Sequence, residues 1–245
     1  RACYRIIVLF ISICWRCFSY SAHNNIAVYR FLNLMFRYGK KLDVFHSNFM
    51  IFIDPEKYAA ARIAVDSSGW ALRDSSAWYD IRIGRDNTKR RWNKAHIAQD
   101  IDTGLIHSWT ITDGPAHDSP QFRRLLAPFR QLEIVVADSA YLSFANVALV
   151  IRKGAIPYIR PKANSVARAR HPRPWKRMIR AFRGQTSAWL DNYHIRSVIE
   201  GLFRSLKSRF GDALRAIRPR MQRKELALKI TAYNVVQVLY IQAAE

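Results

Sequence analysis

One short apolar run constrains the fold of this chain more than any other feature. Residues 132–137 (LEIVVA) are apolar except for Glu133. A strand with one face in water alternates apolar and polar residues, whereas a nearly continuous apolar run is typical of a strand that is buried on both faces. Helices are the usual cover for such a strand, so the sequence predicts an α/β protein with a helix-covered sheet.

The remaining patterns supply the other elements of that sheet. Strand patterns lie at residues 62–65, 94–101, 105–112 and 156–160, and helical patterns lie at residues 118–127, 144–152, 192–209 and 223–242. The turn sequence Asp102-Thr-Gly104 joins two of the strands, which predicts a hairpin. Asp118 is a candidate N-cap, because Pro120 in the first turn is typical of a helix start. This order of elements predicts a mixed sheet flanked by helices.

The first 58 residues follow a less regular pattern than the rest of the chain. A helix is expected at residues 25–38, and Cys14 and Cys17 have the spacing of half a zinc site. No second cysteine pair or histidine cluster is near them in the sequence, so we interpret both as packing residues. The three cysteines of the chain favour a reducing compartment. Because the sequence starts with Arg1, we interpret residues 1–58 as a partial, helical remnant of a longer N-terminal region.

The charge of the chain indicates the kind of partner it binds. Lys and Arg together number 40 against 18 Asp and Glu, which gives a formal net charge of +22. Such an excess predicts a polyanionic partner, either a nucleic acid or an anionic membrane surface. The longest apolar run, residues 6–15, is about half of the roughly 18–20 residues that a membrane-spanning helix needs. We therefore expect a nucleic-acid partner and no membrane.

The basic residues are concentrated in one segment. Between Asp138 and Asp191 the chain contains no Asp or Glu but many Lys and Arg, together with Trp175 and several prolines. A run of like charges is usually a solvated, partly disordered surface. It could equally be a loop that follows a DNA backbone, and the sequence leaves both interpretations open.

Three acidic residues are candidates for catalysis. Asp66 and Asp138 each follow an apolar strand pattern and precede small residues, and Glu200 lies in the predicted helix 192–209. Three carboxylates held close together repel one another, and Mg²⁺ or Mn²⁺ relieves that repulsion. Two such ions about 3.5–4 Å apart can clamp the attacking and leaving oxygens of a phosphoryl transfer. We interpret the comparable acids as turn or cap residues: Asp80, Asp100, Asp102, Asp113 and Asp118. Of these, Asp118 follows His117 in a loop that could approach the site.

Glu200 also belongs to a spaced set of polar residues. Tyr193, Arg196, Glu200 and Lys207 are separated by three, four and seven positions. On a single helix these spacings bring the four side chains close to one stripe. A carboxylate flanked by two cations and a phenol suits the task of holding a metal-binding acid against a phosphate backbone.

These motifs resemble the D-D-E transposases of prokaryotic insertion sequences, specifically the group with a Tyr-Arg-Glu-Lys signature. Tyr193, Arg196, Glu200 and Lys207 match that signature at every spacing. The segments around the two aspartates resemble the first-acid and second-acid motifs of the family, and residues 114–119 (GPAHDS) resemble another recurring segment. The resemblance extends over residues 61–240, and the roughly 60 residues between Asp138 and Glu200 leave no room for the β-rich insertion of some relatives.

The resemblance implies a fold, a chemistry and roles for individual residues. It implies a ribonuclease-H-like catalytic domain at residues 59–245, in which Asp66, Asp138 and Glu200 bind two Mg²⁺ or Mn²⁺ ions. The expected reaction is DNA cleavage and strand transfer at terminal inverted repeats. Arg196 and Lys207 are expected to contact DNA phosphates near the cut, and Tyr193 to support that contact.

Two other functions stay open at this point. A nuclease or resolvase of the same fold would cut DNA without joining it, and an inactive or domesticated transposase remnant would only bind DNA. For the transposase itself we expect a homodimer, because two element ends must be held together. The expected location is the prokaryotic cytoplasm, in association with the nucleoid.

Overall fold

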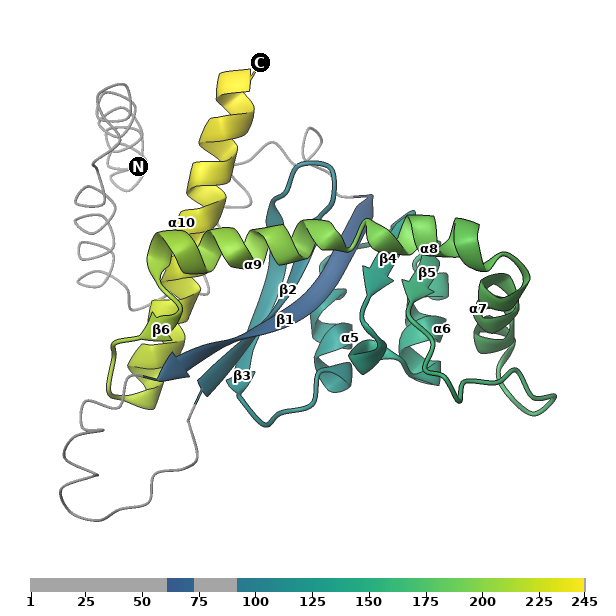
Figure 1. The fold of residues 1–245 in the computed structure, drawn as a ribbon. Coiled ribbons are helices and arrows are strands. Elements are labelled where there is room, and N and C mark those ends of the chain that lie inside the picture. Colours follow the sequence, from purple (N-terminus) through teal and green to yellow (C-terminus); the bar gives the residue numbers. More distant parts are fainter. Residues whose placement is uncertain (1–60, 73–91, 245) are drawn as a thin grey trace, which may run out of the picture. The chain divides into compact units, whose positions relative to one another are not determined.

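The computed structural model describes residues 61–72 and 92–244 (Figure 1). Within these residues, six strands form one sheet with the order β3-β2-β1-β4-β5, and β6 pairs with the far end of β1. The strands are β1 (Arg62–Leu72), β2 (Trp92–Asp100), β3 (Ile106–Asp113), β4 (Ile134–Ala137), β5 (Ile156–Ile159) and β6 (Ala213–Leu214). The first three strands are antiparallel, whereas β4 and β5 run parallel to β1. The predicted mixed sheet is therefore confirmed.

Strand β1 is longer than the sequence indicated. The predicted strand ended at residue 65, and this end was wrong, because β1 continues through Asp66-Ser-Ser-Gly69 to Leu72. Strand β2 supplies hydrogen-bonding partners along this whole length, with Asp66 opposite Ile97. Steric contact also explains why residue 69 is a glycine, since a Cβ at this position would lie 3.1 Å from Cδ1 of Trp92.

The predicted hairpin of β2 and β3 is confirmed. The backbone N–H of Asp100 donates to the carbonyl of Leu105 (2.8 Å), and the carboxylate of Asp100 accepts a hydrogen bond from the N–H of Thr103 (3.0 Å). Gly104 closes the turn with a φ of 72°, a left-handed conformation that glycine adopts without steric cost. Asp100 thus has the turn role that the sequence suggested.

Helices cover both faces of the sheet. They are η1 (Ser119–Gln121), α5 (Phe122–Leu125), η2 (Ser139–Tyr141), α6 (Phe144–Arg152), α7 (Arg173–Gly184), α8 (Thr186–His194), α9 (Ser197–Phe210) and α10 (Pro219–Ala244). Helix α6 has the predicted bounds, and α10 begins four residues before the predicted start. The single helix expected over 192–209 is two helices, α8 and α9, joined at Ile195 and Arg196.

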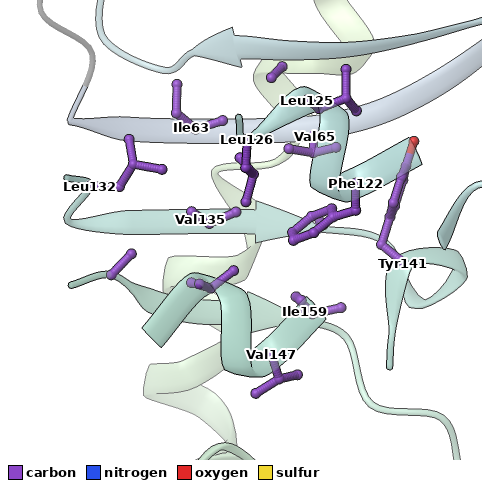
Figure 2. Close-up of a cluster of buried hydrophobic side chains, with 14 of the residues drawn as sticks. Ile63, Val65, Phe122, Leu125, Leu126, Leu132, Val135, Tyr141, Val147 and Ile159 are labelled. Atoms are coloured by element: carbon purple, nitrogen blue, oxygen red, sulfur yellow. The ribbon is translucent and has the colours of Figure 1, made fainter. Parts of the chain in front are cut away.

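The sheet separates two hydrophobic cores because side chains alternate along each strand. Ile63 and Val65 of β1 point into a core shared with α5, α6 and α7 (Figure 2). Ala64, between them, points to the opposite core, which α9 and α10 complete. In β4, Val135 faces the first core, whereas Val136 packs against aromatic side chains of α8. Burial on both faces explains the apolar run in the sequence of β4.

The acid-free basic segment contains a helix. Residues 173–184 form α7, so our interpretation of this part as a loop or partly disordered surface was wrong. Trp175, Met178 and Ile179 are buried in the core beside α6 and fix the helix in place. Their spacing of three and four positions is that of one helix face, a pattern that the surrounding arginines and prolines conceal.

Some predictions concern residues that the structure does not describe. The helix at 25–38, the cysteines at 14 and 17, and the domain boundary near residue 58 all lie outside the described ranges. Of the helices in residues 92–244, none combines the length and the apolar character needed to cross a membrane.

One buried amide ties α10 to the sheet. The side chain of Asn234 accepts a hydrogen bond from the backbone N–H of Ile106 (2.9 Å) and donates one to its carbonyl (2.7 Å). Asn234 is fully buried, so water cannot replace these bonds. The amide therefore satisfies two polar groups at the start of β3.

We predict that Asn234→Ala lowers the free energy of unfolding by about 2–4 kcal/mol, because two buried backbone groups lose their partner. Urea denaturation measures the change. Asn192→Ala is the matched control, since the Asn192 side chain donates to the carbonyl of Ala188 within its own helix at an exposed position. The control should change stability by less than about 0.5 kcal/mol. Equal effects of the two substitutions would contradict the role of Asn234.

Candidate active site

Two of the predicted catalytic acids lie side by side at the end of a parallel strand pair. The last paired residues of β1 and β4 are Val65 and Ala137, and Asp66 and Asp138 follow directly. One carboxylate oxygen of Asp66 accepts the N–H of Ser67 (2.8 Å), and one of Asp138 accepts the N–H of Ser139 (2.6 Å). Each carboxylate is therefore held by the backbone that follows it.

The third acid comes from helix α9 and is linked to the first through an arginine. Arg196 donates from Nη1 to Asp66 Oδ2 (2.5 Å) and from Nη2 to Glu200 Oε1 (2.5 Å). The Glu200 side chain is 58% exposed, whereas that of Asp66 is only 18% exposed. The predicted proximity of a cation to Glu200 is thus present, and the same cation also reaches the sheet.

The charges of the other two acids act on Asp66. The pKa of Asp66 is raised to about 6, chiefly by burial and also by the negative charges of Asp138 and Glu200. The N–H of Ser67 and the guanidinium of Arg196 oppose this rise. Two negative charges therefore repel a third at this site, and a bound divalent cation would relieve that repulsion.

The donor set has the right chemistry for a hard cation. Three carboxylates offer oxygen ligands only, which Mg²⁺ and Mn²⁺ prefer. Within residues 61–72 and 92–244, however, no three acidic, histidine or cysteine side chains stand close enough together to hold a metal ion as arranged. Arg196 accounts for part of the separation between the acids, because its guanidinium bridges Asp66 and Glu200.

Tyr193 lies at the end of α8 rather than on the helix of Glu200. Our prediction of a single helical stripe was wrong, because backbone bonds of the i→i+3 type tighten the chain between α8 and α9, including Arg196 N–H to Tyr193 carbonyl (3.0 Å). Such a turn places position 196 above position 193, and the Arg196 guanidinium lies 5.8 Å from the centre of the Tyr193 ring. The ring is buried and stacks on Trp189. Burial raises the pKa of its hydroxyl.

Lys207 is not brought to the acids. It lies seven residues after Glu200, which corresponds to about 10 Å along α9. Its ammonium group stands 5.2 Å from the ring centre of Trp70, which is buried near the far end of β1. The indole of Trp70 donates to the carbonyl of Gly211 (3.2 Å), so the ring beneath Lys207 is fixed. Of the four signature residues, Tyr193, Arg196 and Glu200 therefore gather at the site.

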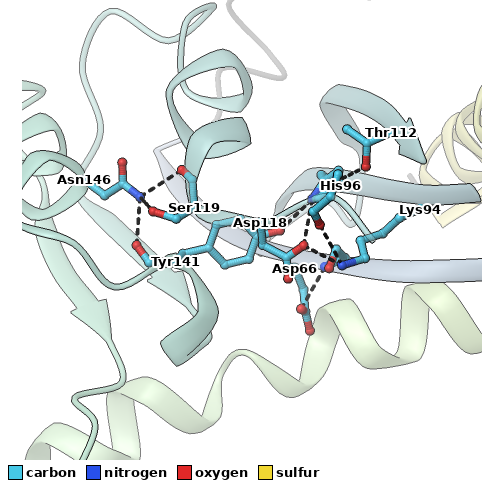
Figure 3. A network of polar contacts seen from close by, with 10 residues as sticks. Asp66, Lys94, His96, Thr112, Asp118, Ser119, Tyr141 and Asn146 are labelled. Atoms are coloured by element: carbon cyan, nitrogen blue, oxygen red, sulfur yellow. Dashed lines mark hydrogen bonds and ion pairs between the residues drawn. The ribbon is translucent and has the colours of Figure 1, made fainter. Parts of the chain in front are cut away.

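Asp118 has the predicted cap position before η1, and its loop approaches the site, but its side chain makes no capping hydrogen bond. Instead its carboxylate accepts a hydrogen bond from Lys94 Nζ (2.9 Å) and lies 3.5 Å from Nδ1 of His96 (Figure 3). Lys94 and His96 alternate on β2 and so point to the same face of the strand. That alternation is the only sign in the sequence of this partnership.

His96 is the buried centre of this polar network. Its Nε2 lies 2.9 Å from the hydroxyl of Thr112, and its Nδ1 lies 3.3 Å from the hydroxyl of Tyr141 (Figure 3). Burial lowers the pKa of His96 to about 4; the charge of Asp118 opposes this shift and that of Lys94 adds to it. The imidazole is therefore neutral at physiological pH.

Tyr141 connects the network to the acids. Burial raises the pKa of its hydroxyl, and the charges of Asp118, Asp66 and Asp138 raise it further. A hydrogen bond with Ser67, the neighbour of Asp66, opposes the rise. No role for Tyr141 was predicted, because nothing in the sequence shows that η2 faces β2.

We predict that the His96 ring in the folded, metal-free protein becomes half protonated near pH 4. The unfolded chain binds this proton near pH 6.5, so the stability that depends on His96 is complete above pH 6.5 and is lost as the pH falls toward 4. NMR titration of the ring nitrogens measures the midpoint, with the urea-unfolded chain as the reference. A folded-state midpoint near 6.5 would show that the ring is not shielded by this network.

Comparison with known proteins agrees with this geometry. The family described as "Transposase DDE domain" matches residues 58–235, which include β1, β4 and α9 with their three acids. The search of curated proteins found no match to the chain. The helix-flanked mixed sheet is also the ribonuclease-H-like arrangement that the sequence predicted. The match spans well over half of the chain, and we conclude that this protein belongs to the DDE transposases.

Proposed function

We propose that this transposase cuts DNA at the terminal inverted repeats of an insertion sequence and joins the freed strand to target DNA. Asp66, Asp138 and Glu200 are the proposed catalytic residues. The observation that carries the proposal is the position of the two aspartates, each directly after the last paired residue of two adjacent parallel strands. Glu200 faces them from α9, and its charge raises the pKa of Asp66.

The same three carboxylates are the proposed ligands of two Mg²⁺ or Mn²⁺ ions. When bound, such ions lower the pKa of a water or of a 3′-hydroxyl and stabilise the charge that develops on the phosphate. The backbone N–H groups of Ser67 and Ser139 each hold one oxygen of the two aspartates, which orients the other oxygen. The exposed position of Glu200 allows its side chain to approach the aspartates.

Arg196 is the proposed contact for a DNA phosphate next to the cut. Its guanidinium now binds two carboxylates, and charged neighbours including Asp66 raise its pKa although burial opposes the rise. A permanently charged, forked group can exchange a carboxylate for a phosphate with little change in geometry. Tyr193 supports this position, since its buried ring lies under the guanidinium. Lys207 would contact a phosphate farther along the strand.

The proposed reaction also requires two DNA ends in one complex. We therefore propose a homodimer on DNA, in which each subunit supplies one set of three acids. Action on chromosomal DNA in a prokaryotic cell places the protein at the nucleoid. Both proposals follow from the reaction of the family rather than from a contact within this chain.

We predict that Glu200→Ala and Asp138→Ala each reduce Mn²⁺-dependent nicking of a labelled element-end duplex by at least about 10³-fold, or about 4 kcal/mol of activation free energy. Each substitution removes one carboxylate of the proposed metal site. Gel analysis of the nicked strand measures the rate, and circular dichroism checks that the variants are folded.

Glu133→Gln is the matched control, because Glu133 is an exposed acid beside β4. It should nick DNA at the rate of the unsubstituted protein. Nicking by the Glu200 and Asp138 variants at the control rate would refute the site assignment. Nicking without joining, when target DNA is supplied, would indicate a nuclease or resolvase. DNA binding with no nicking by any form would indicate an inactive remnant.

We predict that Lys207→Ala flattens the salt dependence of DNA binding. In a plot of log affinity against log salt concentration, the magnitude of the slope should fall by about 0.9, the value for one phosphate contact. Fluorescence anisotropy at several salt concentrations measures the slope. The control is Lys153→Ala, whose ammonium group binds the carbonyl of Phe129 and is not available to DNA. A slope unchanged in the Lys207 variant would remove this residue from the DNA-binding set.

A further inference from the structure

Helix α7 carries a row of arginines that the proposed cleavage site does not use. Arg173, Arg177 and Arg180 are exposed and lie four and three positions apart, so they share one face of the helix. At 1.5 Å per residue the row extends over about 10 Å. Arg183, Arg168 and Arg170 are exposed as well and flank this row in the sequence.

Within the described residues, no acidic side chain pairs with this row. The sequence contains no Asp or Glu from residue 139 to residue 190. Among the ion pairs of residues 61–72 and 92–244, none involves an arginine of α7. Like charges four residues apart destabilise a helix, so such a row costs stability unless a polyanion offsets the repulsion.

The opposite face of α7 fixes the row in place. Trp175, Met178 and Ile179 are 7%, 3% and 0% exposed, and they belong to the core beneath the sheet. The arginines are therefore presented on a rigid element rather than on a loop. An amphipathic basic helix can also bind a membrane surface, but only if its apolar face is free to enter the lipid. In α7 that face is already buried, which favours a nucleic acid.

The position of α7 relates the row to the candidate site. Helix α7 packs against α6 and α8, and α8 leads directly to Arg196 and α9 (Figure 1). The nine residues of α8 span about 13 Å. Lys207 lies on the other side of the acids, in the second half of α9. Helix α7 and Lys207 thus lie at opposite ends of the α8–α9 segment, with Arg196 and Glu200 between them.

We infer that the exposed face of α7 is a second DNA-binding surface, which holds the phosphate backbone of the duplex on the α8 side of the cleavage site. This inference deepens the proposed function, because it assigns the path of the DNA beyond the cut. The ligand is the phosphate backbone of double-stranded DNA, and the contact is independent of base sequence.

The test compares two variants with the same loss of charge. The first is Arg173→Gln, Arg177→Gln and Arg180→Gln together. The control is Arg124→Gln, Arg130→Gln and Arg220→Gln together, three exposed arginines outside α7. Anisotropy with a fluorescent 40-base-pair duplex, in EDTA so that no DNA is cut, gives the affinity over a range of salt concentrations.

For the α7 variant we expect the slope of log affinity against log salt concentration to be smaller in magnitude by about 2.7. This value corresponds to three phosphate contacts at about 0.9 each. The control variant should lose less than about 0.9, because it removes equal charge without a shared surface. Equal slopes for the two variants would refute the α7 surface. Because no cleavage is involved, this result stands even if the protein nicks no DNA, and the nicking assay tests the catalytic proposal separately.

Binding to lipid vesicles tests the other possible partner, an anionic membrane surface. Sedimentation with vesicles of phosphatidylcholine containing phosphatidylserine measures binding to an anionic lipid surface. We expect no difference between the α7 variant and its control in this assay. Loss of vesicle binding in the α7 variant alone, with an unchanged DNA slope, would overturn the inference in favour of a membrane.

Discussion

The parallel pairing of β1 with β4 is the constraint on which the candidate site depends. Both strands are buried on two faces, so their side chains cannot change register without exposing apolar surface to water. The pairing ends at Val65 and Ala137, and it thereby fixes Asp66 and Asp138 as neighbours. Helix α9 packs against β1 on one face of the sheet, which sets the distance of Glu200 from the two aspartates. The core thus determines the geometry of a polar site.

The second property of the site is electrostatic: interacting acidic side chains occur here in a chain that is strongly basic overall. Asp66 is buried enough to have a pKa of about 6, and Arg196 partly compensates its charge. The polar network of Lys94, His96 and Asp118 is connected to Asp66 through Tyr141, because the charges of Asp118 and Asp66 both raise the pKa of the Tyr141 hydroxyl. The arginines of α7, in contrast, have no compensation within the described chain. The acids suit cations and the basic surfaces suit phosphates, and a DNA-cleaving enzyme needs both.

Residues with a strong local pattern could be placed from the sequence. The three acids, the hairpin of β2 and β3 and the bounds of α6 were all predicted, because periodicity and turn residues report local structure directly. The length of β1 was missed, since only its partner β2 shows that Ser67 and Ser68 belong to a strand. The sequence suggested a cap position for Asp118 and a loop that could approach the site, but it cannot show that Lys94, twenty-four residues earlier, lies beside it. The catalytic and metal-binding roles themselves stay predictions.

The sequence by itself determined the fold class, the family and the identities of the candidate acids, because these depend on residue types at short spacings. Only the tertiary structure decided that α8 and α9 are separate, that Lys207 lies apart from the acids, and that the basic segment presents a helix face. Each of these depends on which surface an element packs against: Trp189 and Tyr193 bury beside β4, whereas Ile199 buries against β1 and β2. Burial between elements distant in sequence is a property of the assembled core, and no local pattern encodes it.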